Sequence, residues 1–263
     1  MRRGAVFFDY DGTLVDKAQG VSAPTNATKA AIGKLRANGY LAVLCTGRPL
    51  SYLPDNAEEL PFDGWIMTNG AYAKLGNTVL FNEMIDEKIA RSLMETCERL
   101  HISYALEGQD ACYFRAFSDV FEGFLNRFDI RTDKFYPIEQ MQGWKANKIM
   151  TAYDEESRQI RLEQAFGGEF VFDRHSHFTS CDVSRKGVNK GTGVLQFLAR
   201  LEIPRENSYA IGDSDNDLEM MHAAGTGIAM AQHSQRMSSA ADYITDSVAN
   251  DGVAKALAHF KLI

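Results

Sequence analysis

The sequence predicts an α/β protein in which a parallel-sheet core carries an inserted α+β domain. Short apolar runs that fit buried strands alternate with helical segments over the first part of the chain, and again after about residue 184. Between about residues 83 and 183 this alternation loosens. No Pro-, Gly- or Ser-rich linker separates these parts, which favours an insertion over two consecutive domains. We therefore expect a core made of residues 1–82 and 184–263, and an inserted domain of residues 83–183.

The first part of the core is expected to hold three buried strands, a helix and a hairpin. Short apolar runs bounded by polar residues and glycine fit strands that are buried on both faces. Apolar residues at helical spacing that end at Asn38-Gly39 fit a helix, and Gly76 in a polar turn fits a hairpin. The expected elements are a strand at 5–8, a helix at 25–37, strands at 41–45 and 65–67, and a hairpin centred on 75–78.

The inserted domain and the last part of the chain are expected to differ in their order of elements. The insertion is expected to hold a helix at 86–100, strands at 103–106 and 111–114, a helix along the stripe Phe117, Phe121, Phe124 and Phe128, a strand at 148–153, a helix at 155–166 and a strand at 170–172. The last part is expected to hold helices at 189–201, 215–224 and 253–260, and strands at 209–211, 227–230 and 243–244.

The composition excludes several classes of protein. The chain is 45% hydrophobic and 24% charged, which is ordinary for a globular protein and excludes disordered and fibrous ones. Its net charge of −7 disfavours a dedicated binder of nucleic acid or of an anionic membrane. No apolar run approaches the roughly 18 residues of a membrane-spanning helix. The run at 5–8 is too short for the core of a signal peptide.

The cysteines indicate a reducing compartment. Cys45, Cys97, Cys112 and Cys181 are scattered, with no Cys-x-x-Cys and no Cys/His pair at zinc spacing. Free thiols in a cytoplasmic protein are therefore expected, with a disulfide between two of the cysteines as the alternative. The apolar neighbours of Cys45 favour a small buried residue over a nucleophile.

Short polar segments follow the predicted strands of the core, where each strand ends. Ligands bind at the carboxyl ends of the strands in open parallel sheets, so these segments are expected to meet at one edge. They are Asp9-Tyr10-Asp11-Gly12-Thr13, Thr46-Gly47-Arg48, Thr68-Asn69-Gly70-Ala71 and Gly212-Asp213-Ser214-Asp215-Asn216-Asp217.

Several aspartates at one edge require positive charge, because closely packed carboxylates raise one another's pKa and destabilise the fold. Mg²⁺ with oxygen ligands fits this requirement. Lys190, at the start of a predicted helix, offers a second cation. A metal ion, a lysine and glycine-containing loops together favour a site for phosphate.

Each of these patterns has a simpler interpretation when it stands alone. Asp-x-Asp-Gly-Thr occurs in ordinary turns, and Lys190 fits a solvated surface residue. Asp215 fits the N-cap of a helix and Asp217 its first turn. The acidic run resembles a calcium loop but lacks the later glycine and glutamate of an EF-hand. Four such segments at successive strand ends favour a shared site.

These motifs resemble the haloacid dehalogenase superfamily of aspartate-nucleophile phosphatases (HAD), specifically its Cof-type branch. The resemblance rests on the segments that start at Asp9, Thr46 and Gly212 and on Lys190 in Asn-Lys-Gly. Asn69-Gly70-Ala71 and Asn250-Asp251-Gly252-Val253-Ala254 also resemble that branch. Thr46 follows Asp9 by 37 residues and Lys190 follows Thr46 by 144. The long second interval places the inserted cap as in Cof-type enzymes, unlike the β-phosphoglucomutase group. The resemblance implies a Rossmann-like core with an α+β cap.

The resemblance implies that Asp9 and Asp11 are catalytic. Asp9 would attack phosphorus and form an aspartyl-phosphate, and Asp11 would protonate the leaving oxygen and then accept a proton from water. Mg²⁺ would be held by the Asp9 carboxylate, the backbone carbonyl of Asp11 and Asp213, with Asp217 as a support behind these ligands.

The resemblance also implies residues that hold the substrate. The groups expected at the phosphate are Thr46, Gly47, Lys190 and Asn216, with Asn216 expected to bind either the phosphate or Lys190. Arg48 and Asn69 are further candidates for binding the substrate. Residues expected to face its non-phosphate part, although each also fits an ordinary surface position, are Arg48, Glu107, Arg115, His175 and His177.

The implied function is that of a Mg²⁺-dependent phosphatase acting on a small phosphorylated metabolite, such as a sugar phosphate. Neither nucleic acid nor a membrane is expected as a partner, and no oligomeric state is predicted. Two alternatives stay open: a phosphomutase, and a non-catalytic regulator that binds a phosphorylated metabolite.

Overall fold

The chain folds into two compact units. The structure, a computed structural model, describes residues 3–116, 118–127, 130–175 and 179–263. Unit 1 comprises Met1–Gly47, Asp55–Phe81 and Asn189–Ile263. Unit 2 comprises Arg48–Pro54 and Asn82–Val188. Compared with the predicted domains, unit 2 extends to residue 188 and also takes in the short segment 48–54.

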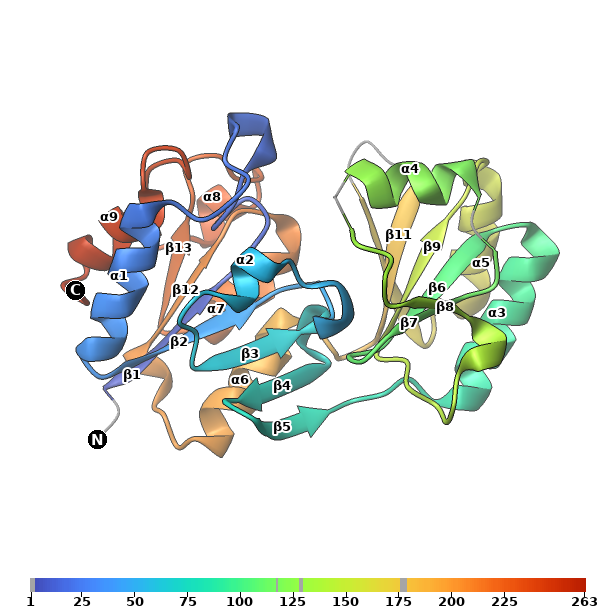
Figure 1. Ribbon diagram of the computed structural model, residues 1–263, viewed down its shortest axis with the longest axis horizontal. Coiled ribbons are helices and arrows are strands. Elements are labelled where there is room, and N and C mark those ends of the chain that lie inside the picture. The colour runs from blue at the N-terminus through green and yellow to red at the C-terminus, as the bar shows by residue number, and fades with distance from the viewer. Residues whose placement is uncertain (1–2, 117, 128–129, 176–178) are drawn as a thin grey trace. The chain divides into compact units, whose positions relative to one another are not determined.

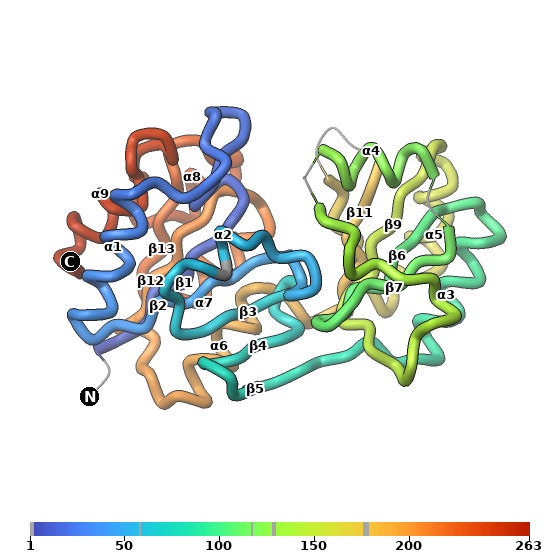
Figure 2. Tube along the Cα trace, viewed as in Figure 1, coloured from blue at the N-terminus to red at the C-terminus, as the bar shows by residue number. Residues whose placement is uncertain are grey.

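Unit 1 is built on a sheet whose described strands follow the order β14-β13-β12-β1-β2-β3-β4-β5. The central strand β1 pairs in parallel with β2 and with β12. Strands from the first and the last of the three chain segments of unit 1 therefore lie side by side (Figure 2). Antiparallel pairing begins between β3 and β4. The strands are β1 Gly4–Phe8, β2 Tyr40–Cys45, β3 Gly64–Met67, β4 Tyr72–Leu75, β5 Thr78–Asn82, β12 Ser208–Gly212, β13 Thr226–Ala229 and β14 Tyr243–Ile244.

Helices pack against this sheet (Figure 1). Phe197 of α6 and Met220 of α7 belong to the same hydrophobic cluster as Phe7 and Val43 of the sheet. Residues of α1 contact both α9 and β2. The helices of unit 1 in the described residues are α1 Asn26–Ala37, α2 Asp55–Glu58, α6 Lys190–Arg200, α7 Leu218–Ala223, α8 Met237–Ala240 and α9 Gly252–His259.

The central strand β1 is buried on both of its faces. All five of its residues are buried. The ring of Phe7 packs edge-on against Phe197 at 5.8 Å, while the next residue, Phe8, lies 5.9 Å from the ring of Phe62. A strand with apolar partners on both faces reads as a continuous apolar run, which is the pattern from which it was predicted. The first polar residue after β1 is Asp9, at the carboxyl edge of the sheet.

Unit 2 contains a second sheet, whose described strands follow the order β10-β11-β9-β6-β7-β8. Its pairs are antiparallel except for β7 and β8, which are parallel. The strands are β6 Ser103–Glu107, β7 Cys112–Phe114, β8 Phe135–Pro137, β9 Lys148–Ala152, β10 Phe170–Arg174 and β11 Ser180–Arg185.

The two faces of this second sheet differ in chemistry. One face packs against α3 and α5 in an apolar cluster that contains Leu106. The other face packs against α4 and Tyr52 in a cluster that contains Ala105. Because side chains alternate along a strand, Glu107 lies on the same face as Ala105. In the part of unit 2 that the structure describes, the helices are α3 Glu87–Leu100, α4 Asp119–Arg127 and α5 Glu156–Phe166.

The predicted fold class is confirmed, and most predicted elements occur within a few residues of their expected bounds. The predicted helix at 215–224 begins as the 3₁₀ turn Asp215–Asp217 before α7. Of the predicted phenylalanine stripe, Phe121 and Phe124 lie in α4. Phe117 and Phe128 lie outside the described residues.

Strands β8 and β11 were not predicted from the sequence, and β11 explains why unit 2 extends beyond residue 183. In β11, Ser180, Asp182 and Ser184 alternate with Cys181 and Val183, which belong to the apolar cluster on the other face. This alternation of short polar residues hides the strand in a search for apolar runs. Since β11 continues to residue 185 and pairs with β9 and β10, these residues are part of the second sheet.

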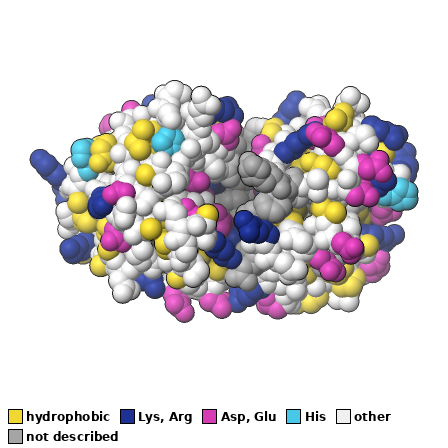
Figure 3. Space-filling view, turned by 90° about the horizontal axis from the view of Figure 1, so that it is seen from above, with side chains coloured by type: hydrophobic (Ala, Val, Ile, Leu, Met, Phe, Trp, Pro, Cys, Tyr) yellow, Lys and Arg dark blue, Asp and Glu magenta, His cyan; other side chains and the backbone are white. Residues whose placement is uncertain are grey.

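Surface and cysteine chemistry agree with the expectations from composition. On the face shown in Figure 3, lysine and arginine side chains are mixed with aspartate and glutamate side chains. Among the described residues, no helix is both long and apolar enough to cross a membrane. All four cysteines are free, as predicted, and all four are buried, as predicted for Cys45. Burial raises the pKa of the Cys45 thiol, so this thiol stays protonated at neutral pH.

Candidate active site

Three parallel strands of unit 1 bring the predicted polar segments to one edge of the sheet. Phe8, the last residue of β1, is in register with Leu44 of β2 and Ile211 of β12. The segments that follow these strands therefore leave the sheet at the same level. The Asp9 amide continues the pairing by donating to the Ile211 carbonyl at 2.9 Å, and the Thr46 amide donates to the Ile66 carbonyl at 2.9 Å.

Lys190 is held in place by the start of α6. The helix begins with a capping box, in which the Asn189 side chain accepts from the Thr192 amide at 2.8 Å and the Thr192 hydroxyl accepts from the Asn189 amide at 3.0 Å. Gly70 has φ +92°, and a Cβ there would lie 2.1 Å from the Asn189 carbonyl oxygen. Only glycine permits this backbone conformation and this close approach, so the start of α6 packs directly on the loop after β3.

The ammonium of Lys190 lies between two carboxylates. Its Nζ is 2.5 Å from Asp9 Oδ1 and 2.6 Å from Asp217 Oδ1, and all three side chains are buried. Burial opposes the charge on Lys190, but the two carboxylates raise its pKa. Lys190 is therefore a buried cation in direct contact with the first aspartate of the Asp-x-Asp motif, and the simpler interpretation as a solvated lysine is wrong.

Asp217 orders the loop that carries Asp213. Its Oδ2 accepts from the Asp213 amide at 3.0 Å and from the Ser214 amide at 3.2 Å. Asp213 Oδ1 in turn accepts from the Thr13 hydroxyl at 3.3 Å. Gly12 has φ +91°, and a Cβ there would lie 2.2 Å from Asp213 Oδ2, so the backbone next to Asp11 passes directly beside the Asp213 carboxylate.

Asp9, Asp213 and Asp217 form a cluster of three acids whose nearest oxygens lie within 4.8 Å of one another. Burial and the charge of Asp217 raise the pKa of Asp9 to about 7, although Lys190 acts in the opposite direction. Burial and the other two aspartates raise the pKa of Asp213 to about 9. One lysine is thus too little positive charge for three acids. Oxygen donors with surplus negative charge are the set that a hard divalent cation such as Mg²⁺ prefers, so the residues present fit such an ion.

Thr46, Gly47 and Asn69 lie together at the same edge. Thr46 is buried, and its carbonyl accepts from the Asn69 amide at 3.2 Å. Thr68 and Asn69 have φ values of 51° and 52°, in the left-handed region that non-glycine residues seldom adopt. A Cβ at Gly47 would lie 2.9 Å from Asn69 Oδ1, so Asn69 approaches the Gly47 backbone closely.

Two other predicted residues have surroundings that the sequence did not indicate. Asn216 is exposed, and its Oδ1 accepts from the Ser214 hydroxyl at 2.7 Å, while the contacts of Lys190 are to Asp9 and Asp217. Arg48 is buried and belongs to unit 2, although it directly follows Gly47 in the chain.

The candidate residues of the insertion have different surroundings from one another. Arg115 is an exposed residue paired with Glu139 and Glu98. His175 Nδ1 lies 2.8 Å from the Ser180 hydroxyl oxygen, and its ring stacks on Phe124 at 4.8 Å. His177 lies outside the described residues.

Glu107 is fully buried, so the interpretation of this residue as a surface group is wrong. Its Oε2 lies 3.0 Å from Nζ of Lys148, which also lies 2.6 Å from Asp182 Oδ2. The sequence did not single out Lys148 or Asp182. The indication available in the sequence was the charged residue Glu107 two positions after Ala105, which places both side chains on the same face of the strand.

Tyr10, between Asp9 and Asp11, is a further residue whose contact was not foreseen. It is buried, and its hydroxyl donates to Asn56 Oδ1 at 2.6 Å, while Asn56 Nδ2 donates to the Ser22 carbonyl at 3.0 Å. These bonds tie the loop after β1 to α2.

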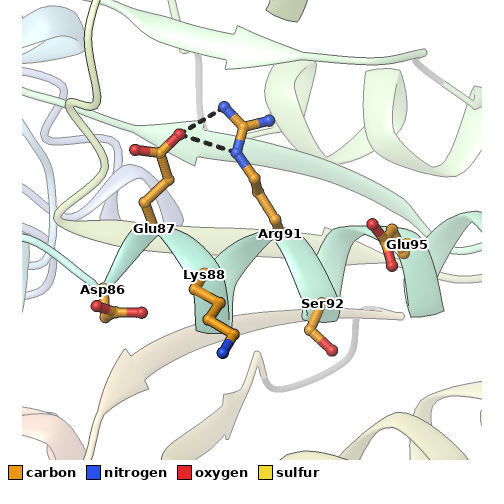
Figure 4. Close-up of a pocket in the computed structure, with 6 residues that line it drawn as sticks. All are labelled: Asp86, Glu87, Lys88, Arg91, Ser92 and Glu95. Carbon is orange, nitrogen blue, oxygen red and sulfur yellow. Dashed lines mark hydrogen bonds and ion pairs between the residues drawn. The ribbon is translucent and has the colours of Figure 1, made fainter.

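A surface depression on unit 2 has the wrong chemistry for an anionic substrate. Its charged groups are mostly acidic, and Glu87 Oε1 accepts from Arg91 Nη2 at 2.6 Å and from Nε at 2.9 Å, as helix neighbours four residues apart do (Figure 4). It is lined by Asp86, Glu87, Lys88, Arg91, Ser92 and Glu95. The acidic cluster of unit 1, with its buried lysine, is the stronger candidate site.

Comparison with known proteins adds independent findings. The family model of haloacid dehalogenase-like hydrolases matches residues 6–257. The 5-amino-6-(5-phospho-D-ribitylamino)uracil phosphatase YcsE of Bacillus subtilis is 29% identical, over 98% of this chain and 95% of the relative. The phosphoglycolate phosphatase of Methanosarcina acetivorans is 27% identical, over 98% and 96%.

Solved structures agree with the sequence comparison. The HAD subclass IIB sugar phosphatase BT4131 superposes with a TM-score of 0.86 at 25% identity, covering 99% of this chain and 100% of that one. The phosphatase BT1666 of Bacteroides thetaiotaomicron also gives 0.86, at 28% identity and with coverage of 99% and 96%. The match extends over both units, so the insertion belongs to the shared fold.

Proposed function

The chain belongs to the haloacid dehalogenase-like hydrolases and is a phosphatase of small phosphorylated substrates, and on this premise we propose that it is a Mg²⁺-dependent phosphatase that works through an aspartyl-phosphate. The observation that carries the proposal is the contact of Asp9 with Lys190 inside a cluster of three acids.

Asp9 is the proposed nucleophile. One of its oxygens contacts Lys190, which fixes the orientation of the carboxylate and lowers its pKa, in opposition to the burial and the neighbouring acids that raise that pKa to about 7. Asp9 attacks the phosphorus atom, the ester bond breaks, and water later releases inorganic phosphate from the aspartyl-phosphate. Asp11, two residues on, is proposed to protonate the leaving oxygen and then to accept a proton from that water.

Asp9, Asp213 and the backbone carbonyl of Asp11 are proposed to hold Mg²⁺. Asp217 fits a supporting role better than a ligand, because its oxygens accept from Lys190 and from two backbone amides. When bound, Mg²⁺ supplies positive charge that offsets the carboxylates and the phosphoryl oxygens.

Thr46, Gly47 and Lys190 are proposed to hold the phosphoryl oxygens. Lys190 supplies charge and the buried segment Thr46-Gly47 supplies hydroxyl and amide donors. Asn216 remains a proposed phosphate contact, with its oxygen turned to Ser214 and its amide nitrogen as the donor. Asn69 and Arg48 are proposed substrate contacts.

The proposed substrate is a small phosphorylated metabolite such as a sugar phosphate, which is supported by the named activity of BT4131. Residues of the inserted domain, 83–183, are proposed to set its specificity. The free cysteines support a reducing, cytoplasmic location.

The test is release of inorganic phosphate from a panel of phosphorylated metabolites, with Mg²⁺ and with EDTA. We expect activity with Mg²⁺ on at least one sugar phosphate and its loss with EDTA. Asp9→Asn is expected to lower kcat by about 10⁴-fold or more, because the nucleophile is lost. Asp246→Asn, at a half-exposed aspartate paired with Lys255, is the control and is expected to retain full activity.

Other outcomes separate the alternatives. Unchanged phosphate release by Asp9→Asn on every active substrate would overturn the proposal. Formation of an isomerised phosphate ester in place of inorganic phosphate would identify a phosphomutase. Binding of a metabolite without turnover of any member of the panel would identify a regulator.

A further inference from the structure

The segment Arg48–Pro54, here called the anchor segment, directly follows the proposed phosphate-holding residues Thr46 and Gly47. Up to Gly47 the chain belongs to unit 1, and from Arg48 to Pro54 it belongs to unit 2. Thr46 bonds through its backbone to Ile66 and Asn69 of unit 1. The chain therefore passes from unit 1 into a segment of unit 2 directly after the Thr46-Gly47 peptide.

Three consecutive residues of the anchor segment bond to three consecutive residues of unit 2 in the reverse order. The Leu50 amide donates to Gln109 Oε1 at 3.1 Å, and the Ser51 hydroxyl donates to the Gly108 carbonyl at 2.8 Å. The Tyr52 hydroxyl donates to Glu107 Oε1 at 2.6 Å. The anchor segment is therefore aligned along the end of β6.

The bond from Tyr52 to Glu107 is the one with a buried charged partner. Both side chains are buried, and the Tyr52 ring packs against Phe135 at 5.9 Å. Glu107 is held from its other oxygen by Lys148, at 3.0 Å. A buried hydroxyl left without an acceptor is costly, so this contact holds the Tyr52 hydroxyl in one place.

A series of hydrogen bonds connects the anchor segment to Asn82 and Glu83. These are the first residues after the backbone passes from unit 1 into unit 2 for the second time, after Phe81. Gln109 Nε2 donates to Asn147 Oδ1 at 3.1 Å. Asn147 is buried, and its Nδ2 donates to Asn82 Oδ1 at 2.6 Å and to the Glu83 carbonyl at 3.0 Å. The anchor segment and the first residues of the insertion are therefore held by one set of side chains.

We propose that Tyr52 is a positioning residue, whose bond to Glu107 fixes the anchor segment and through it the geometry of the Thr46-Gly47 peptide for phosphate. This inference rests on the proposed function, since it takes Thr46 and Gly47 as the phosphate contacts. A displacement of about 1 Å in a positioning group is enough to change binding and rate severalfold or more. Tyr52 itself does not touch the phosphate.

The test compares two tyrosine substitutions of equal chemistry. Tyr52→Phe removes the hydroxyl and keeps the ring that packs on Phe135. Tyr104→Phe is the matched control, because the Tyr104 hydroxyl donates to Glu98 Oε1 at 2.9 Å in the same unit, from a buried ring, without contact to the anchor segment. The dissociation constant of inorganic phosphate is measured by calorimetry with Mg²⁺ present, and kcat and KM are measured with p-nitrophenyl phosphate.

For Tyr52→Phe we expect phosphate to bind about three- to tenfold more weakly and KM to rise by a similar factor, with a smaller change in kcat. For Tyr104→Phe we expect both constants within twofold of the unaltered protein, even where its melting temperature falls. Ser51→Ala, which removes the neighbouring bond to Gly108, is expected to act in the same direction as Tyr52→Phe. Amide hydrogen exchange in residues 48–54 is expected to become faster in Tyr52→Phe and to stay unchanged in Tyr104→Phe.

Faster exchange in the anchor segment with unchanged phosphate affinity would overturn the inference, as would equal weakening by the two tyrosine substitutions. Failure of the proposed function gives a different result. If the unaltered protein binds phosphate but hydrolyses no ester, the phosphatase proposal fails, while the calorimetric comparison still decides the role of Tyr52. If the unaltered protein binds no phosphate, the placement of phosphate at Thr46 and Gly47 is overturned, and the role of Tyr52 with it.

Discussion

A buried lysine lies between two carboxylates in unit 1 and again in unit 2, but within the described residues only the cluster in unit 1 has a third acid beside it. In unit 1, Lys190 contacts Asp9 and Asp217 at 2.5 and 2.6 Å, and Asp213 completes the group. Three carboxylates face one ammonium, and burial together with the neighbouring acids raises the pKa of Asp9 to about 7 and that of Asp213 to about 9.

The cluster in unit 2 is closer to neutral and is surrounded by hydrogen-bond donors. Lys148 contacts Asp182 at 2.6 Å and Glu107 at 3.0 Å. The Tyr52 hydroxyl donates to Glu107, and His175 Nε2 lies 3.4 Å from Asp182 Oδ1. Burial opposes ionisation of Asp182, but Lys148 and His175 outweigh it and lower its pKa.

The difference between the two clusters lies in the surplus of negative charge. The groups of unit 2 satisfy one another, which suits a structural role. The groups of unit 1 leave a charge deficit that a cation and a phosphoryl group fill in the proposed reaction, which suits a catalytic role. The same pair of residue types therefore serves two purposes, and substitutions at the two lysines distinguish them.

The largest effect on turnover is expected from Lys190→Met. Removal of this ammonium takes away the proposed phosphate contact and the counter-charge of Asp9, so kcat on p-nitrophenyl phosphate should fall by about 10²–10³-fold. Two carboxylates left without their buried partner should also destabilise the protein by about 3–5 kcal/mol, read from urea unfolding. A variant that keeps most of its kcat would contradict the role proposed for Lys190.

Sequence patterns were sufficient for the fold class and for the segments that form the edge of unit 1. Asp9 and Asp213 follow strands that read as continuous apolar runs, and parallel strands end at one edge. The contact of Lys190 with Asp217 depends on how α6 packs on Gly70. No local sequence pattern predicts a contact between residues this far apart in the chain. The family resemblance did not supply it either, because it offered Asn216, and not Asp217, as a partner of Lys190.

The cluster of unit 2 was beyond the reach of the same patterns. Lys148, Glu107 and Asp182 come from three strands whose pairing the sequence did not specify. A single charged residue in a strand is normally interpreted as a surface residue. Its buried partner lies on a neighbouring strand, and only the register of that strand determines which residue it is. The anchor segment was missed for a related reason, since Tyr52 finds its partner 55 residues further along the chain.

A smaller effect is expected from Mg²⁺ on stability, and it should depend on pH. Without Mg²⁺, the raised pKa values of Asp9 and Asp213 mean that the folded protein keeps protons that the unfolded chain loses above about pH 4. Stability from these groups is therefore greatest below that pH and falls as the pH rises towards about 9. Mg²⁺ requires the ionised carboxylates, so its stabilisation should increase over the same range.

The measurement is the melting temperature with Mg²⁺ and with EDTA, at about pH 6 and about pH 9. The rise caused by Mg²⁺ should be about 5 °C larger at the higher pH. Asp213→Asn should remove most of this difference. In unit 2, the lowered pKa of Asp182 adds no slope there, because it gives stability that is lost only below about pH 4. Burial raises the pKa of Glu107, but this acts equally with Mg²⁺ and with EDTA and cancels in the comparison. A rise that is equal at both pH values would contradict the charge surplus of unit 1.

The smallest effect on turnover is expected from Lys148→Met, the substitution that matches Lys190→Met in unit 2. It leaves Glu107 and Asp182 as buried carboxylates without their cation, so unfolding in urea should show a loss of about 3–5 kcal/mol. We expect kcat to change by less than about threefold, because no group of this cluster is proposed to touch the reacting atoms.

Neutralising both acids in the same variant, with Glu107→Gln and Asp182→Asn, should recover much of the stability, since no buried charge remains. The equivalent rescue in unit 1 would require Asp9→Asn and would abolish turnover, so stability can be separated from kcat in unit 2 but not in unit 1. A fall in kcat as large as that of Lys190→Met would show that the two clusters serve the reaction equally.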